Sequence, residues 1–204
     1  MRRGDHWGQF LNSISKKEAR EILKKNLPNL PEREDHEAAI LRRLFSLLQG
    51  KTKIITYSPD LMYEVDVLPI IESCPLPRPT SFIEARHSAE WYFPRMEEGK
   101  RLRFLRPRSF EKNAMGLFEP IGDEEISVED AELILVPALG FHEKGFRLGR
   151  GGGYYDRILN SESLQKKTVG LSFSKLFPVP FLPESHDIKI GKMITETQIH
   201  SFLD

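Results

Sequence analysis

The sequence lacks the features that define several large classes of protein. There is one cysteine, Cys74, among 204 residues, so the chain cannot form an internal disulfide, and the reducing cytoplasm is the expected setting. The longest apolar run, Leu133 to Phe141, is interrupted by Pro137 and is too short to cross a bilayer. The first residues contain no apolar segment typical of a secretory signal. We therefore expect a soluble, cytoplasmic protein.

An excess of charge of either sign is also missing. The chain has 30 basic and 30 acidic residues, which excludes a globally basic nucleic-acid coat, and its 39% of apolar residues argues against intrinsic disorder. The charges are nevertheless segregated. Residues 16–26 hold five basic and two acidic side chains, and residues 95–112 hold seven basic and three acidic side chains. Residues 119–132 hold seven acidic side chains and no basic one. Each block can be a solvated surface, whereas a basic block beside a glycine-rich loop favours an anionic ligand.

Hydrophobic periodicity predicts helices and strands that alternate along the chain. Helices are predicted over residues 15–27, 34–49, 64–73 and 154–159. Strands are predicted over residues 53–57, 90–93, 102–105, 133–136, 169–173 and 193–197. Residues 75–90 are rich in proline and are expected to form a loop. The alternation predicts one α/β domain over residues 15–204 with a mostly parallel sheet, after an N-terminal extension, 1–14, that could be flexible.

The most informative segment is the glycine-rich run from Arg147 to Arg157. Its glycines permit positive φ and let backbone N–H groups converge on an anion, and the helix that follows favours phosphate at its N-terminus. Arg147 and Arg150 add forked donors suited to phosphate oxygens. The run lacks the Gly-Lys-Ser/Thr end of a Walker loop and the spacing of a dinucleotide fingerprint. It indicates a phosphate site, with a plain flexible turn or an RNA-binding tail as the alternatives.

Three residues at the start of the predicted helix have two interpretations each. The Asp156 carboxylate can cap the helix, or it can coordinate Mg²⁺ that bridges the same phosphates, and spacing leaves both open. Tyr154 and Tyr155 are suited to packing, and one of them could stack on a planar ring.

The chain resembles the 5-formyltetrahydrofolate cyclo-ligase (methenyltetrahydrofolate synthetase) family. The resemblance is carried by residues 133–159 and above all by Arg-Leu-Gly-Arg-Gly-Gly-Gly-Tyr-Tyr-Asp at 147–156. Further matching segments, in chain order, are Lys16 to Arg20, Glu64 to Asp66, Tyr92 to Arg95, Gly116 to Pro120, His186-Asp187 and Thr195-Glu196. The chain departs from the family pattern at residues 75–90, which look inserted, and at Gly191, where the family often has a second aspartate. The spacing between Tyr57 and Glu64 is also about one residue longer.

The resemblance implies a fold, an activity and a set of site residues. The fold is a three-layer α/β/α arrangement with a mostly parallel central sheet. The activity is ATP-dependent cyclisation of 5-formyltetrahydrofolate to 5,10-methenyltetrahydrofolate, with release of ADP and phosphate, through a phosphorylated formyl (imidate-phosphate) intermediate. Mg²⁺ is the implied cofactor and ATP the co-substrate. We expect a monomer that binds small molecules and neither nucleic acid nor membrane.

The implied site residues fall into three groups. The ATP-binding residues are Lys16, Arg20, Arg147, Gly149, Arg150, Gly151, Gly152, Gly153, Tyr154 and Tyr155, of which Arg147 and Arg150 are the expected catalytic residues. The substrate-binding residues are Glu64, Phe93, Phe141 and Tyr154. The metal ligands are Asp156 and Asp187.

Two other functional classes stay open at this point. The first is another α/β phosphate-ester enzyme, such as a sugar-phosphate isomerase or a CoA-transferase relative. The second is a non-enzymatic module that binds nucleotides or RNA. Tight binding of Mg-ATP without sugar-phosphate turnover would exclude the first, and weak, strongly salt-dependent RNA binding without folate binding would favour the second.

Overall fold

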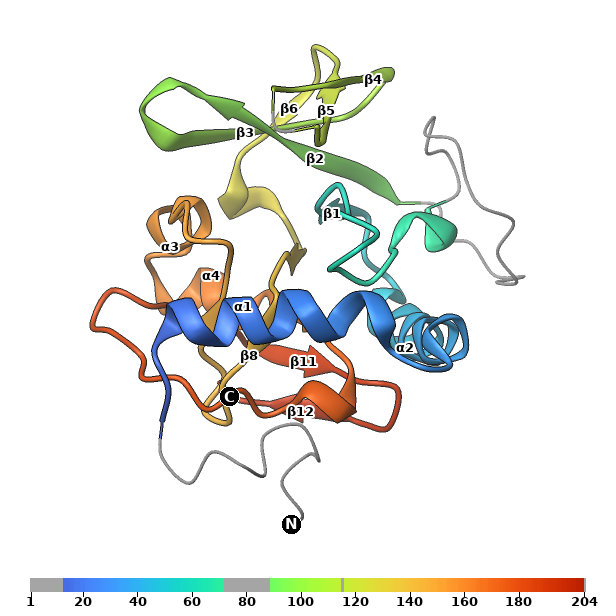
Figure 1. Ribbon diagram of the computed structural model, residues 1–204. Helices are drawn as coiled ribbons and strands as arrows, with labels where there is room; N and C mark the ends of the chain where they lie inside the picture. Colours follow the sequence, from blue (N-terminus) through green and yellow to red (C-terminus); the bar gives the residue numbers. More distant parts are fainter. Residues whose placement is uncertain (1–12, 72–88, 115, 204) are drawn as a thin grey trace.

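A central sheet of eight strands organises the protein, as the computed structural model shows (Figure 1). The structure describes residues 13–71, 89–114 and 116–203. The strand order across the sheet is β12-β11-β10-β7-β1-β2-β3-β6. Strands β11, β10, β7, β1 and β2 run parallel, and β12, β3 and β6 add antiparallel edges. The mostly parallel α/β sheet predicted from the sequence is confirmed.

The elements have the following bounds. The sheet strands are β1 Lys53–Ile55, β2 Glu90–Glu97, β3 Arg101–Leu105, β6 Glu125–Ile126, β7 Leu133–Val136, β10 Thr168–Leu171, β11 Lys192–Ile194 and β12 Ile199–Ser201. Two separate hairpins consist of β4 Ser109–Lys112 with β5 Phe118–Ile121, and of β8 Gly140–Phe141 with β9 Arg147–Leu148. The helices are α1 Lys16–Asn26, α2 Arg33–Leu48, α3 Tyr154–Ile158 and α4 Glu162–Lys166. Short 3₁₀ segments occupy Leu27–Asn29, Leu68–Ile70, Glu98–Lys100, Val128–Asp130 and Ser174–Leu176.

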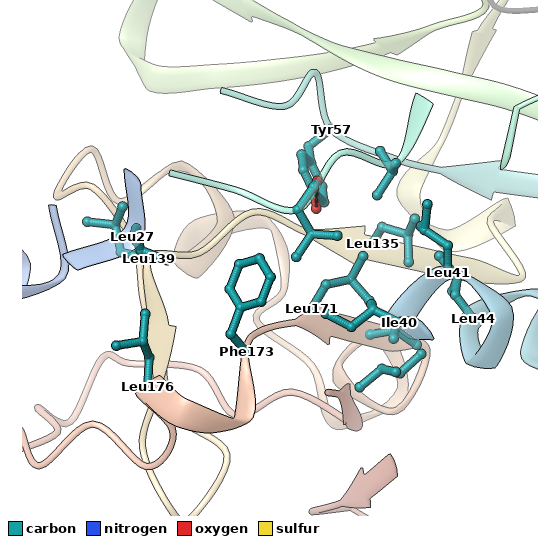
Figure 2. Packing of buried hydrophobic residues seen from close by; sticks show 14 of the residues in the cluster. Leu27, Ile40, Leu41, Leu44, Tyr57, Leu135, Leu139, Leu171, Phe173 and Leu176 are labelled. Atoms are coloured by element: carbon teal, nitrogen blue, oxygen red, sulfur yellow. Dashed lines mark hydrogen bonds between the residues drawn. The ribbon is translucent and has the colours of Figure 1, made fainter. Parts of the chain in front are cut away.

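The central strands are buried on both faces because helices cover both. Side chains alternate across the sheet, so Ile54 and Leu135 join the cluster formed with α1 and α2, whereas Ile55 and Ile134 join the cluster formed with α3 and α4. Figure 2 shows the first cluster, in which Leu135 and Leu171 of the sheet approach the leucine-rich face of α2. The result is the expected α/β/α arrangement of three layers.

Local signals place the first helix where the sequence predicts it. The Ser15 side chain caps α1 by accepting a hydrogen bond of 3.2 Å from the Glu18 N–H. Lys24 and Lys25 lie in the last turn, where positive charge is favourable, and Pro28 falls in the 3₁₀ segment that follows. α1 matters for function because its first turn extends to the cleft described below.

Other predicted elements differ from the structure. The helix predicted over residues 64–73 is wrong: Glu64 to Val67 form an irregular loop, and only Leu68–Ile70 is helical, as a 3₁₀ turn that contains Pro69. Residues 72 and 73, with Cys74 and nearly all of the predicted loop 75–90, lie outside the described residues. The predicted extension 1–14 lies outside them up to residue 12. Residues 119–132, over which the sequence pattern predicts no strand, contain β6 and all but the first residue of β5.

The blocks of opposite charge neutralise each other across this part of the fold. Because β3 pairs with β6 in antiparallel register, Arg103 lies 2.8 Å from Glu125, and Arg106 lies 3.2 Å from Glu124. Arg108 pairs in the same way with Asp123. Exposed pairs of this kind stabilise little. They do show that several basic side chains of residues 95–112 are paired with acidic side chains of residues 119–132 and are not grouped into a binding site for an anion.

No helix among the described residues is long and apolar enough to cross a membrane.

Gly191 stands where only glycine fits, which explains one departure from the family pattern. A Cβ added there would lie 2.6 Å from the carbonyl oxygen of Lys166 and 2.9 Å from that of Gln165, both at the end of α4. Backbone oxygens cannot move aside as a flexible side chain can. An aspartate at this position therefore requires α4 to shift.

We expect Gly191→Ala to lower the free energy of unfolding by about 1–3 kcal/mol, because the added methyl group overpacks a rigid contact. Urea denaturation measures the change. Lys24→Ala, on the exposed side of α1, is the control and should change stability by less than about 0.5 kcal/mol. An unchanged denaturation midpoint for Gly191→Ala would show that the end of α4 can shift to accommodate the methyl group without loss of stability.

Candidate functional site

The topology of the sheet creates a cleft between β1 and β7. These neighbours are parallel, but β1 continues to β2 on one side, whereas β7 continues to β10 on the other. In open α/β sheets the connections diverge at such a point and leave a crevice at the carboxyl ends of the strands. A cleft of about 890 Å³ lies here, lined by Tyr57 and Ser58 after β1 and by Pro137 and Ala138 after β7. Its volume is at the large end of the range for small-molecule sites.

One side of the cleft is the glycine loop, residues 149–153. Gly151 has φ +103° and Gly153 has φ +70°, in the left-handed region that glycine adopts without steric cost. A Cβ on Gly149 would lie 2.5 Å from Nη1 of Arg147, so this position also favours glycine. The helix that follows, α3, has only five residues. Its dipole is therefore weaker than the sequence suggested, and the loop amides and nearby basic side chains carry most of the attraction for an anion.

Helix α1 contacts the glycine loop through Arg20. Arg20 donates a hydrogen bond of 2.8 Å from Nε to the Gly149 carbonyl, and its guanidinium carbon lies 3.8 Å from where a Cβ of Gly151 would be. Lys16, one turn earlier, lines the same cleft. Its Nζ lies 2.6 Å from the carboxylate of Asp187 and 2.8 Å from that of Glu184. The first turn of α1 and residues 184–187, which are far apart in the sequence, thus meet at the cleft.

Lys16 keeps its charge in this position. Burial opposes the charge, but the hydrogen bonds and negative charges of Asp187 and Glu184 outweigh it and raise the pKa of Lys16. The same interactions lower the pKa of Glu184. Asp187 also accepts a hydrogen bond of 2.7 Å from the Glu184 N–H. Both oxygens of Asp187 are therefore engaged by protein donors.

A buried ion pair joins Arg147 to Asp156. Nη2 of Arg147 lies 3.1 and 3.0 Å from the two carboxylate oxygens, and Nη1 donates to the Pro137 carbonyl at 3.0 Å. The guanidinium also lies 5.4 Å from the ring centre of Tyr155. Arg147 Nε and the Tyr155 hydroxyl are buried without a hydrogen-bond partner among the described residues, which is unusual for polar groups.

On the opposite side, the loop after β1 presents two carboxylates to the glycine loop. Nη1 of Arg150 lies 2.9 Å from Oδ2 of Asp60, and Nη2 lies 3.5 Å from Oε2 of Glu64. Glu64 is 6% exposed. Burial raises its pKa, and the positive charge of Arg150 only partly opposes that effect. Arg33 of α2 fixes the loop by donating hydrogen bonds to the carbonyls of Met62 and Glu64, at 2.9 and 2.7 Å.

The far end of the cleft is mostly apolar. It is lined by Pro94, Met96, Leu102, Leu117 and Phe118, from β2, β3 and the approach to β5. One carboxylate, Glu119, lies among them. Its Oε1 accepts hydrogen bonds from Asn113 Nδ2 at 3.0 Å and from the Met96 N–H at 3.2 Å. A flat apolar ring with polar edges would fit this end, whereas a polyanion fits the other.

The structure brings most of the predicted site residues together. The predicted residues that line the cleft are Lys16, Arg20, Glu64, Arg147, Gly149, Arg150, Gly151, Gly152, Gly153, Tyr154, Tyr155, Asp156 and Asp187.

Phe93 and Phe141 are the exceptions, and the structure corrects their placement. Both are 0% exposed and neither lines the cleft. Phe93 packs edge-to-face on Phe110, with ring centres 5.0 Å apart, and Phe141 fills the space beside Gly170, where a Cβ would lie 2.3 Å from the ring. An aromatic residue in a strand looks the same in the sequence whether it faces a core or a ligand, so the sequence could not separate these cases.

Several lining residues were not singled out from the sequence as site residues. They are Tyr57, Ser58, Lys100, Glu119 and Arg157, to which Asp60 is added because it pairs with Arg150 of the lining although it lines a smaller neighbouring pocket. Two of them carried a usable signal. Asp60 is an acidic residue four positions before Glu64, and Glu119 lies in the Gly116–Pro120 segment that matches the family.

Comparison with known proteins gives consistent results. The model of the 5-formyltetrahydrofolate cyclo-ligase family matches residues 12–196. The 5-formyltetrahydrofolate cyclo-ligase of Haemophilus influenzae is 25% identical over 197 residues, which cover 89% of this chain and 100% of that protein. The mouse protein of the same name is 32% identical over a shorter match, 37% of this chain and 39% of the mouse protein.

Solved structures agree in fold. The 5,10-methenyltetrahydrofolate synthetase of Aquifex aeolicus superposes with a TM-score of 0.72 at 26% identity, covering 94% of each chain. The synthetase of Mycoplasma pneumoniae, at 20% identity, shares the fold with a TM-score of 0.65 over 90% of this chain and 99% of that one.

We expect Asp156→Ala to destabilise the protein by about 3 kcal/mol, because it leaves the buried Arg147 guanidinium without its counter-charge. Urea denaturation at neutral pH measures the loss. Asp123→Ala removes the partner of Arg108 in an exposed pair and should cost less than about 1 kcal/mol. Equal small losses in both variants would contradict the structural importance of the Arg147–Asp156 pair.

Proposed function

The chain belongs to the 5-formyltetrahydrofolate cyclo-ligase family, and from this premise we propose that it converts 5-formyltetrahydrofolate to 5,10-methenyltetrahydrofolate with hydrolysis of ATP to ADP and phosphate. The observation that carries the proposal is the composition of the cleft. Its glycine loop and basic side chains suit a triphosphate, its apolar end suits a pterin, and Arg150 and Glu64 meet between them.

The reaction needs phosphoryl transfer before ring closure, because a formamide oxygen is a poor leaving group. The formyl oxygen attacks the γ-phosphorus of ATP, and the bond to the ADP oxygen breaks. N10 of the folate then attacks the formyl carbon, loses its proton, and phosphate leaves with the former formyl oxygen. Such a sequence depends on positioning and on charge stabilisation at the transferred group.

The phosphate half of the cleft supplies those requirements. The amides of the glycine loop, Arg20 and Lys16 would hold the nucleotide phosphates. Arg150 would contact the transferred phosphoryl group, because its guanidinium lies on the side of the loop that faces Glu64. Arg147 supports the site through its pair with Asp156, which holds its guanidinium against the floor of the cleft.

The carboxylates of the cleft fit Mg²⁺ bound chiefly by nucleotide phosphates. Asp156 and Asp187 offer hard oxygen donors, and each is already paired with a cation, Arg147 or Lys16. Asp156, with a side chain 19% exposed, is more accessible than Asp187, at 7%, and both oxygens of each carboxylate accept hydrogen bonds from the protein. When bound, the ion would neutralise charge on the phosphoryl oxygens. Asp187 would in either case orient Lys16.

The folate half of the cleft centres on Glu64. An ionised carboxylate there can accept hydrogen bonds from the N–H groups of a pterin. Met96, Leu117 and Phe118 would contact the ring in place of the buried Phe93 and Phe141, together with Tyr154. We further propose a monomer in the cytoplasm that acts on these small molecules, in keeping with the single cysteine.

The activity is tested by incubating the protein with 5-formyltetrahydrofolate and Mg-ATP and recording the absorbance of methenyltetrahydrofolate. We expect ATP-dependent turnover, and a loss of about 10³-fold in Arg150→Ala, because a phosphoryl-stabilising arginine contributes on that scale. Arg103→Ala, which removes an exposed guanidinium paired with Glu125, is the control and should keep wild-type rates. No turnover by the wild type would refute the proposed function, and full activity of Arg150→Ala would refute the role of Arg150.

The raised pKa of Glu64 predicts how folate binding depends on pH. As pH falls through this pKa the carboxylate is protonated, loses its negative charge and gains an O–H donor, so it accepts hydrogen bonds from the pterin N–H groups less well and the KM for folate should rise. The rise should begin at a higher pH than an exposed glutamate would give. Glu64→Gln should raise the KM for folate about 10-fold or more and flatten this limb of the profile, with the KM for ATP little changed. Equal effects on both KM values would argue against a pterin contact.

A further inference from the structure

We propose that Asp60 is a positioning residue that holds Arg150 at the junction between the two substrates. The inference rests on the proposed function for the identity of those substrates. Among the described residues, the Asp60 side chain bonds to Arg150 and to the Met62 N–H, and its backbone N–H bonds to Glu64. Its role would therefore be exerted through that guanidinium.

Three side chains of one loop fix the Arg150 guanidinium. Oδ2 of Asp60 lies 2.9 Å from Nη1, Oε2 of Glu64 lies 3.5 Å from Nη2, and the ring centre of Tyr63 lies 5.7 Å from the guanidinium carbon. The backbone of Arg150 belongs to the glycine loop on the other side of the cleft. The Arg150 side chain thus joins the phosphate-binding loop to the loop that carries the expected pterin ligand.

The remaining donors of Arg150 are available to a ligand. A guanidinium has five N–H groups, and the contacts with Asp60 and Glu64 engage one edge of it. The side chain is 35% exposed and lines the open cleft. A long arginine side chain has many rotamers, and the shorter contact, with Asp60, selects the one that points between the two halves of the site. Orientation of this kind is what phosphoryl transfer requires.

Asp60 contacts the folate half by different atoms. Its backbone N–H donates a hydrogen bond of 2.9 Å to Oε2 of Glu64, and its Oδ1 accepts one of 3.1 Å from the Met62 N–H, which shapes the turn. Its other carboxylate oxygen pairs with Arg150. The main chain of Asp60 therefore supports Glu64, while the charge of its side chain acts on Arg150.

This division gives a specific expectation for Asp60→Asn. The amide oxygen can still accept from the Met62 N–H, and the backbone N–H to Glu64 is unchanged, but the negative charge on Arg150 is lost. We expect kcat to fall about 10- to 100-fold, since small misplacements of a catalytic group have effects of this size. The KM values for folate and ATP should stay within about threefold. A merely structural residue would not separate kcat from both KM values in this way.

The experiment compares steady-state kinetics of the full chain with calorimetric titration of 5-formyltetrahydrofolate. Asp123→Asn, which alters an acid paired with Arg108 on an exposed edge, is the matched control and should keep wild-type constants. A wild type without turnover refutes the proposed function itself. An active wild type with unchanged kcat in Asp60→Asn, or with folate affinity lost in that variant, overturns only the present inference. If Asp60→Asn does not fold, Asp60→Ser, whose hydroxyl can accept from Met62, replaces it.

A double-mutant cycle tests whether Asp60 acts through Arg150. Arg150→Lys keeps a positive charge but loses the forked geometry that Asp60 orients. We expect Asp60→Asn to lower kcat less than about threefold in the Arg150→Lys background. The same loss in both backgrounds would show that Asp60 acts by another route and would overturn the proposal.

Discussion

The parallel pairing of β1 with β7 is the constraint on which the site depends. Chain segments leave these two neighbouring strands in opposite directions, so the space above their carboxyl ends cannot be filled by either crossover. The loop after β1 supplies Asp60 and Glu64, and the segment after β7 leads through the β8–β9 hairpin to the glycine loop. Helices on both faces bury the central strands and so hold the two loops at a fixed separation.

Compensation of charge is the second principle of the structure. A net charge of zero arises from blocks that meet in space: the basic side chains of β3 face the acidic segment that contains β6. Within the cleft the pairs have a different character. Arg147 with Asp156, Lys16 with Asp187, and Arg150 with Asp60 are all partly or fully withdrawn from water. Each carboxylate there orients a cation that a phosphate would otherwise have to order on binding.

The cleft joins two kinds of surface because it joins two kinds of local structure. Glycines at positive φ expose backbone donors beside the α1 cations, which suits a triphosphate. The antiparallel β2–β3 ribbon and the approach to β5 add Met96, Leu102 and Phe118, which suits a ring. The Arg150 side chain lies between these two surfaces and contacts Asp60 and Glu64 on the opposite loop. This is where a phosphoryl group would have to pass from one ligand to the other.

Local patterns in the sequence determined the elements whose signals are short-range. Helical periodicity with a Ser15 cap defined α1, continuous apolar residues defined β7, and the glycine motif with Arg150 identified the phosphate loop and the family. The apolar spacing after Glu64 predicts a helix, but the segment is an irregular loop whose apolar side chains pack into the core between the layers rather than along one helix face. The tertiary structure alone decided that Phe93 and Phe141 are core residues and that Asp60 meets Arg150. Those contacts join segments far apart in sequence, and no local pattern encodes which face of a strand, or which distant loop, a side chain will meet.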